Sequence, residues 1–337
     1  MSSAADKLMT FLTSLAKLGV ARRRLIVLIY HRVLESGDAF RTGDATAEEF
    51  DAQIGMLSRT FPCYTFGRSV QEYLREPGNE GPAVAVTFDD GYRDNHDLAL
   101  PILQKHGVPA TFFVASGYLN NGIMWNDLLI ESIRSAIGER IRIPEADVEE
   151  TYLSDENDAV CLANNLIGTV KHWDRSRRQD FVESLARRLS YEANVRLMMN
   201  HAEVRSMSDA GMEIGAHTVS HPILSNLATD ESMQEIIQSK SDLEHIIGKE
   251  VKSFAYPNGR PGHDFSAKDV DNVVAAGFSA AATTAPGYAS PDADSFLVPR
   301  LSIWGDSPLK LPLHMVRNLY SAPDPNLDLE GMPLRTG

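Results

Sequence analysis

Residues 83–92 have the sequence Ala83-Val84-Ala85-Val86-Thr87-Phe88-Asp89-Asp90-Gly91-Tyr92, an apolar run that ends in two adjacent aspartates. A continuous apolar run of this kind is typical of a β-strand that is buried on both faces. Burying one unpaired carboxylate is costly, and a second like charge beside it adds to the cost. The pair therefore needs a cationic partner, and a divalent metal ion is the first candidate.

A second segment supplies the residue types that would complete a metal site. Gly215–His221 contains two histidines, His217 and His221, four positions apart. This spacing places both imidazoles on one face of a helical turn. Because Pro222 disfavours helical geometry at His221, the pair is expected at the boundary of an element. Two imidazoles and one carboxylate form a three-ligand set that leaves a coordination position open for water.

The chain alternates predicted strands with predicted helices, which indicates an α/β fold with a parallel sheet. The predicted strands cover residues 25–30, 84–88, 110–115, 212–216, 251–255, 278–283 and 296–303. The predicted helices between them cover residues 47–60, 66–74, 95–106, 231–247 and 267–276. About seven strands in this order favour a (β/α)7-type distorted barrel, in which reactive groups lie at the carboxyl ends of the strands.

This alternation covers only part of the chain. Helical patterns replace it between Ser116 and Asn200, so we expect an inserted helical subdomain at about residues 117–200 of a barrel domain that spans 24–320. Apolar residues at helical spacing predict an amphipathic helix over residues 1–23, which either packs on the domain or docks on a membrane surface or partner. The proline-containing polar residues 321–337 predict a flexible tail.

Composition excludes several classes of protein. The net charge of −14 argues against nucleic acid or an anionic membrane as the main partner. No segment has the roughly 18 to 20 apolar residues of a membrane span. Residues 1–23 lack the order of basic and apolar parts that a secretory signal needs. We therefore expect a cytoplasmic protein, which residues 1–23 would hold at a membrane if they dock there.

The motifs resemble those of a known family. Thr87–Tyr92 is similar to the first motif of the polysaccharide deacetylases, the NodB-homology family of carbohydrate esterases, and His217–His221 is similar to the second. Phe254–Gly259 resembles a variant of the third motif. The resemblance covers roughly residues 24–304. It implies a hydrolase that removes N-acetyl groups from an acetylated amino-sugar substrate, an N-acetylglucosamine-type poly- or oligosaccharide, and releases acetate.

The resemblance also implies a role for each residue. Asp90, His217 and His221 would hold the metal, and Asp89 would act as the general base. The reverse assignment of the two aspartates is an open alternative. Zinc fits two histidines and one carboxylate, although cobalt, nickel or iron accept the same ligands.

Two histidines are candidates for the acid that protonates the departing amine. Family members of the usual layout supply a histidine near the C-terminus, and Leu311–His314 superficially fits that motif through His314. Ile29–Val33 resembles the first strand of deacetylases that act on poly-N-acetylglucosamine, in which a permuted motif order makes this histidine, His31, the acid. We favour His31 as the acid. The alternative is that His31 only takes part in a hydrogen-bond network.

The third motif departs from the family pattern. Ala255 stands where most members have an arginine that pairs with the base, and Arg300, in a later predicted strand, offers a substitute that would hold Asp89 through a bidentate contact. A surface ion pair is the alternative for Arg300. Tyr256 and Asn258 are the candidate substrate- or oxyanion-binding residues of this motif. Asn258 stands where a tyrosine is common, and its backbone N–H is a candidate oxyanion donor. A plain turn is the alternative.

Two other functions stay open. One is hydrolysis of a C–N bond in a small amide or cyclic ureide on the same scaffold, which a closed pocket would favour over a broad groove. The other is non-catalytic carbohydrate binding. The presence of Asp89, Asp90, His217 and His221 argues against it, because a scaffold without catalysis has no chemical need for the whole set.

Overall fold

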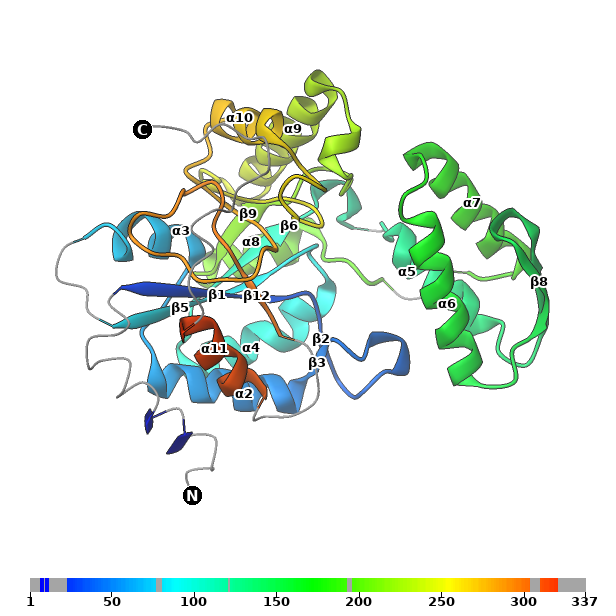
Figure 1. The fold of residues 1–337 in the computed structure, drawn as a ribbon, viewed down its shortest axis with the longest axis horizontal. Helices are drawn as coiled ribbons and strands as arrows, with labels where there is room; N and C mark the ends of the chain where they lie inside the picture. Colours follow the sequence, from blue (N-terminus) through cyan, green and yellow to red (C-terminus); the bar gives the residue numbers. More distant parts are fainter. Residues whose placement is uncertain are drawn as a thin grey trace. The chain divides into compact units, whose positions relative to one another are not determined.

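The computed structural model describes residues 7–8, 10–11, 23–76, 81–120, 122–192, 196–303 and 310–320. The chain divides into two compact units (Figure 1). The helical unit comprises residues 37–42 and 120–198, and the barrel unit comprises 1–36, 43–119 and 199–337. Apart from residues 7–8, 10–11 and 23, the helix predicted over 1–23 lies outside the described residues, as does the tail predicted over 321–337.

Parallel strands form the centre of the barrel unit. In the described ranges their order is β11 (Ala280–Ala282), β10 (Ser253–Ala255), β9 (Glu213–Ala216), β6 (Ala110–Val114), β5 (Pro82–Phe88), β1 (Arg24–Tyr30) and β12 (Leu301–Ser302), with β4 (Cys63–Tyr64) beside β5. The strands β1 and β5 pair along their whole length, from Arg24 opposite Pro82 to Tyr30 opposite Phe88. This central pair carries the first motif.

One segment joins the two edges of the sheet. Val298 forms a bridge to Ala282 of β11, and Leu301 pairs with Leu28 of β1. The stretch before and within β12 therefore closes the sheet into a distorted barrel. The (β/α)7-type barrel predicted from the sequence is confirmed.

Alternate side chains of each strand enter two different cores. Ile26 and Leu28 pack outward in a core shared with the helices, whereas Leu25 and Val27 belong to a smaller core inside the barrel. The strands of the inner core contribute mainly small residues, which fit a narrow interior: Ala83, Ala85, Ala255, Ala280 and Ala282. Because both faces are buried, these strands appear in the sequence as continuous apolar runs.

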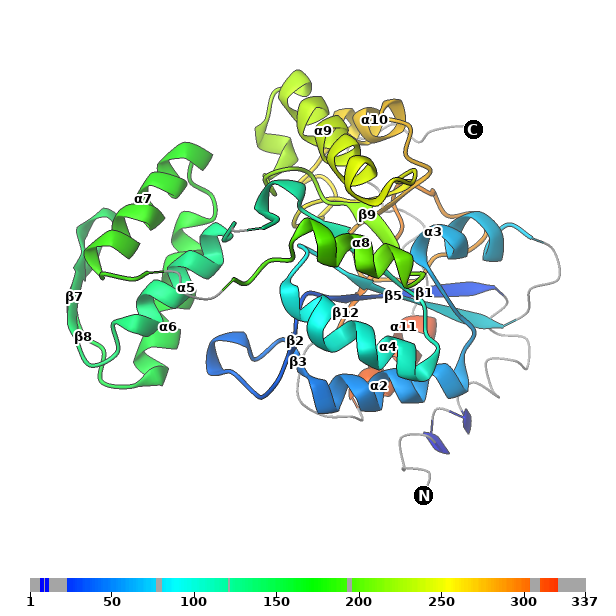
Figure 2. The same cartoon turned by 180° about the vertical axis from the view of Figure 1, so that it is seen from behind.

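Helices cover the outside of the barrel. They are α2 (Ala47–Thr60), α4 (Leu100–His106) preceded by a π-helical turn over Asn95–Ala99, α8 (His201–Asp209), α9 (Thr229–Ile247), α10 (Ala267–Ala275) and α11 (Lys310–Tyr320). A further helix, α3 (Phe66–Arg68), continues in a π-helical turn over Ser69–Tyr73, and its buried Phe66, Val70 and Tyr73 pack into the inner core. Figures 1 and 2 show α2 beside α4 and α9 beside α10. Among the described residues, no helix has both the length and the apolar character needed to cross a membrane.

The helical unit has a core of its own. It contains α5 (Trp125–Ser135), α6 (Glu156–Val170), α7 (Arg175–Arg188) and an antiparallel pair, β7 (Arg140–Ile143) and β8 (Val148–Tyr152). The hairpin of this unit was not expected from the sequence. Nor was the membership of residues 37–42, which join this unit because Arg41 pairs with the buried Asp127 at 2.7 Å.

Candidate active site

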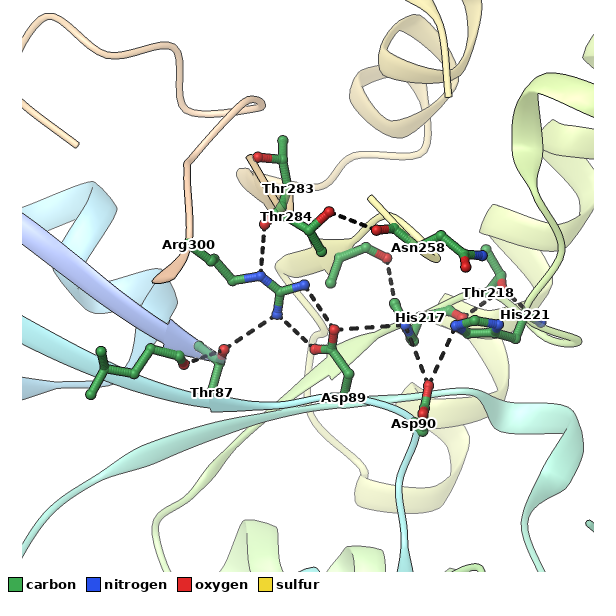
Figure 3. A network of polar contacts seen from close by, with 12 residues as sticks. Thr87, Asp89, Asp90, His217, Thr218, His221, Asn258, Thr283, Thr284 and Arg300 are labelled. Atoms are coloured by element: carbon green, nitrogen blue, oxygen red, sulfur yellow. Dashed lines mark hydrogen bonds and ion pairs between the residues drawn. The ribbon is translucent and has the colours of Figure 1, made fainter. Parts of the chain in front are cut away.

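Side chains predicted to be functional gather at the carboxyl ends of the barrel strands (Figure 3). Asp89 directly follows β5, and its N–H donates a hydrogen bond of 3.0 Å to Tyr30 O at the end of β1. The alternation that turns Ala85 and Thr87 inward continues to Asp89, so its carboxylate points into the mouth of the barrel. His217 follows β9 in the same way.

Arg300 and Asp89 form a buried, bidentate ion pair. Each terminal nitrogen of the guanidinium donates to one carboxylate oxygen at 2.7 Å. Arg300 is fully buried, and its Nε donates to Thr283 O at 2.8 Å, while Nη1 also reaches Thr87 Oγ1 at 3.3 Å. The contact expected from the sequence is therefore present, and it fixes the carboxylate in one orientation.

The ion pair keeps Asp89 charged. Burial alone would raise the pKa of this carboxyl, but the charge of the hydrogen-bonded Arg300 guanidinium outweighs it, and the pKa falls to about 2. Asp89 is thus ionised at neutral pH. A carboxylate with so low a pKa accepts a proton readily only from an acidified donor, such as a water polarised by a nearby cation.

Asp90 faces two histidines. Its Oδ1 lies 3.6 Å from His217 Nε2 and 3.4 Å from His221 Nε2, and one ligand atom from each residue lies within 4.8 Å of the others. These separations are longer than good hydrogen bonds. The two adjacent aspartates thus have different partners, since Asp89 pairs with an arginine and Asp90 converges with imidazoles.

The ring of His217 is held in one tautomer. Its Nδ1 lies 2.7 Å from Ala255 O, a carbonyl that can only accept, so Nδ1 carries the proton. Burial lowers the pKa of His217 to about 4, which leaves the ring neutral at neutral pH. Nε2 therefore presents a lone pair to Asp90. A carbonyl behind the imidazole is the usual support of a metal-binding histidine.

The donor set fits a divalent metal ion. Bonds of about 2.0–2.1 Å in a tetrahedral site place neighbouring ligand atoms about 3.3 Å apart. The 3.4 and 3.6 Å separations around Asp90 Oδ1 are close to this edge length. Two imidazoles and one carboxylate, with a further position left open, are also the ligands of a catalytic rather than a structural site.

The backbone around the cluster is strained. Several residues other than glycine have positive φ here: Asp90 (75°), Thr218 (63°), His221 (52°) and Asn258 (58°). Left-handed conformations of such residues are unfavourable, most of all for a β-branched threonine. They persist where surrounding contacts enforce them, and such positions concentrate at functional sites.

The third motif contributes a backbone donor and a buried ring. Asn258 O accepts a hydrogen bond of 2.6 Å from Thr284 Oγ1, and within the described part of the chain the Asn258 N–H has no acceptor. Tyr256 is fully buried and stacks on Phe265, with ring centroids 3.8 Å apart. Its ring therefore belongs to the outer core, which leaves Asn258 as the candidate oxyanion group of this motif.

The two candidate acids lie in different places. His31 directly follows β1, and its carbonyl accepts a hydrogen bond of 2.9 Å from Asn95 Nδ2. His314 is exposed on α11, on the side opposite the buried Leu311 and Met315. His31 is also exposed, so what distinguishes it from His314 is its position directly after β1, level with Asp89 of the neighbouring chain segment after β5.

Comparison with known proteins places the chain in a family. A family model described as polysaccharide deacetylase matches residues 77–154 and 174–278, which together are just over half of the chain. The chain belongs to the polysaccharide deacetylase family. The resemblance inferred from the motifs is confirmed, and the matched residues include Asp89, Asp90, His217 and His221.

Individual relatives are distant. YxkH of Bacillus subtilis (strain 168), named as a polysaccharide deacetylase, is 21% identical over 281 residues, which cover 83% of this chain and 71% of YxkH. The structure of the Streptococcus pyogenes deacetylase PplD in complex with acetate is 18% identical with a TM-score of 0.56, covering 88% of this chain and 98% of PplD. A polysaccharide deacetylase from Bacillus cereus has the same identity and TM-score, with 69% of its chain covered. These structures agree on the fold.

Some participants were not found from the sequence. Ala255 supports His217 through its carbonyl, and a backbone group leaves no mark on residue identity. Glu235 of α9 binds the turn between the two histidines, but a glutamate on a polar helix carries no local signal. Only the three-dimensional arrangement reveals such residues.

Proposed function

We propose that this protein is a metal-dependent deacetylase that removes N-acetyl groups from an N-acetylglucosamine-type poly- or oligosaccharide and releases acetate. One observation carries the proposal. The buried Asp89 carboxylate, oriented by Arg300, lies beside the three-ligand cluster of Asp90, His217 and His221. A base next to a metal centre with an open position is the arrangement that amide hydrolysis needs.

Three residues at the barrel mouth would transfer protons or stabilise the negative charge that develops on the carbonyl oxygen. Asp89 takes a proton from the attacking water while Arg300 keeps the carboxylate in place. The Asn258 N–H donates to the carbonyl oxygen as it becomes negative. His31 gives a proton to the nitrogen that leaves as an amine. A divalent ion held by Asp90, His217 and His221 supplies Lewis-acid polarisation when bound, with zinc the best match to these ligands.

Acetate release tests this function. The metal-loaded protein is incubated with N-acetylglucosamine oligosaccharides of increasing length and, separately, with a small acetamide and a cyclic ureide. We expect acetate from the oligosaccharides, loss of activity after chelation and recovery when zinc is added back. Hydrolysis of the small amides with no release from any acetylated sugar would refute the proposed substrate class.

Replacing His31 and His314 by alanine, one at a time, distinguishes the two candidate acids. Replacing His31 should slow acetate release by about 10²- to 10⁴-fold, the usual contribution of a general acid, and leave metal binding intact. The His314→Ala variant should be as active as the wild type, because His314 lies on the outer helix α11 and not at the carboxyl end of a barrel strand. Turnover is measured at saturating substrate. Unchanged turnover after the loss of His31 would remove it from the mechanism.

A further inference from the structure

The turn between the two histidines depends on a carboxylate from a helix. Glu235 of α9 accepts hydrogen bonds from Val219 N–H at 3.0 Å and Ser220 N–H at 2.9 Å through one oxygen. Its other oxygen accepts the Ser220 hydroxyl. Val219 and Ser220 lie directly between His217 and His221, so one ionised side chain satisfies the backbone donors at the centre of the turn.

The opposite side of the turn is held by the segment after β6. Ser116 N–H and Gly117 N–H donate to Thr218 O and Val219 O at 3.1 and 2.8 Å. The two segments lie close together at Gly117, where an added Cβ would be only 2.7 Å from Val219 O. The turn is therefore clamped, with its carbonyls bound on one side and its N–H groups bound by Glu235 on the other.

The contacts that hold the turn matter more for the position of His221 than for that of His217. His217 is 1% exposed, and its ring is fixed separately by Ala255 O. The His221 side chain is 17% exposed, and its backbone N–H is bound by Thr218 Oγ1 within the same turn at 3.0 Å. Thr218 and His221 both have positive φ, a conformation that the turn keeps only while its contacts enforce it.

We propose that Glu235 is a positioning residue of the metal centre, whose carboxylate holds the Val219–Ser220 backbone and thereby keeps His221 in place against Asp90. The inference rests on the metal centre proposed above. Glu235 reaches the turn through its hydrogen bonds with Val219 and Ser220. It acts through the conformation of the turn, as groups that orient metal ligands do in other sites.

The test compares substitutions on one helix. Glu235→Ala removes all three hydrogen bonds, whereas Glu235→Gln keeps the shape and an oxygen that can accept both N–H groups. Glu244→Ala is the matched control, because Glu244 also lies on α9 and accepts a loop N–H, that of Val251, at 3.0 Å, but far along the helix from the turn. Glu235→Asp, which keeps the charge and withdraws the acceptor by one methylene, replaces the alanine variant if that variant does not fold.

Cobalt binding by the full-length apo-protein is the readout, since the visible spectrum of Co²⁺ reports its coordination geometry as well as its affinity. We expect about 10- to 100-fold weaker binding and an altered spectrum for Glu235→Ala, with the glutamine variant close to wild type. Glu244→Ala should bind as the wild type does. Amide exchange at Val219 and Ser220 should accelerate in Glu235→Ala and not in Glu244→Ala.

Two results would overturn the inference: wild-type affinity and spectrum in Glu235→Ala, or an equal loss of affinity in Glu244→Ala, which would indicate a general effect on stability. A wild-type protein that binds no cobalt would instead overturn the proposed metal centre. The failure of the inference and the failure of the proposed function are thus distinguishable.

Discussion

Replacing Arg300 by methionine is expected to lower the free energy of unfolding of the metal-free protein by about 3–5 kcal/mol at neutral pH, because it leaves a buried carboxylate without its partner. Asp89 is 2% exposed and Arg300 is 0% exposed, so water cannot replace the lost contact. Urea denaturation of the two proteins measures the difference. A loss below about 1 kcal/mol, the range of exposed ion pairs, would contradict this account.

The stability that the Asp89–Arg300 pair contributes should decrease as the pH is lowered. The pKa of Asp89 in the folded protein, about 2, is below its ordinary value of 3.8, so the pair contributes its full stability above about pH 4 and loses it as the pH falls toward 2. In Arg300→Met, burial without the guanidinium raises the pKa of Asp89 instead. The difference between the two proteins should therefore shrink as the pH is lowered.

Two control variants isolate the ion pair. The double variant Arg300→Met, Asp89→Asn removes the unpaired charge as well, so it should be more stable than Arg300→Met alone. Arg68→Met breaks the exposed pair with Glu72, whose side chains are 61% and 53% exposed. That change should leave the urea midpoint almost unmoved.

Replacing Asp89 by asparagine is expected to reduce acetate release by about 10²- to 10⁴-fold, because the amide cannot take the proton of the attacking water. The change is nearly isosteric, and an asparagine at this position can still accept from Arg300 through its amide oxygen. Because the exchange leaves Arg300 buried without its counter-ion, the free energy of unfolding should fall as well, so turnover is compared under conditions in which both proteins are folded. Turnover is measured with the metal-loaded protein, and a variant that stays active would show that the base is misassigned.

Local sequence patterns predicted the barrel well where strands are long and buried. The strand predicted over 84–88 is β5, which begins two residues earlier, at Pro82. The helix predicted over residues 47–60 has those bounds in the structure, with Thr46 and Glu49 forming a capping box at its start. The strand prediction was less accurate where a segment pairs with its neighbours at only a few residues. The strand predicted over 296–303 is regular only at Leu301–Ser302, because Arg300 N–H donates to Ala285 O and not to a neighbouring strand.

The helical unit shows a second limit of local patterns. Residues 140–143 alternate exposed and buried positions and form β7, but they lie among strong helical signals that obscured them. The place of residues 37–42 depends on ion pairs such as Arg41 with Asp127, which are far apart in the sequence. Interactions between residues that are distant in the sequence produce no periodic pattern from which they could be predicted.

The candidate site was predictable to the extent that it lies in compact motifs. Asp89-Asp90 and the two histidines are recognisable by spacing, and Arg300 was expected because Ala255 cannot pair with a carboxylate. The same logic fails for Ala255 O behind His217 and for Glu235 behind the turn. These groups act through the backbone, so residue identity alone does not reveal them.

The central claim is that two adjacent aspartates have separate roles, with Asp90 as the metal ligand and Asp89 as the base. A metal titration of the Asp90→Asn and Asp89→Asn variants, carried out side by side on folded apo-protein, tests it most directly. We predict that Asp90→Asn loses most of its affinity for zinc or cobalt, whereas Asp89→Asn binds as the wild type does. Tight binding by Asp90→Asn together with loss of binding by Asp89→Asn would contradict the claim and reverse the two roles.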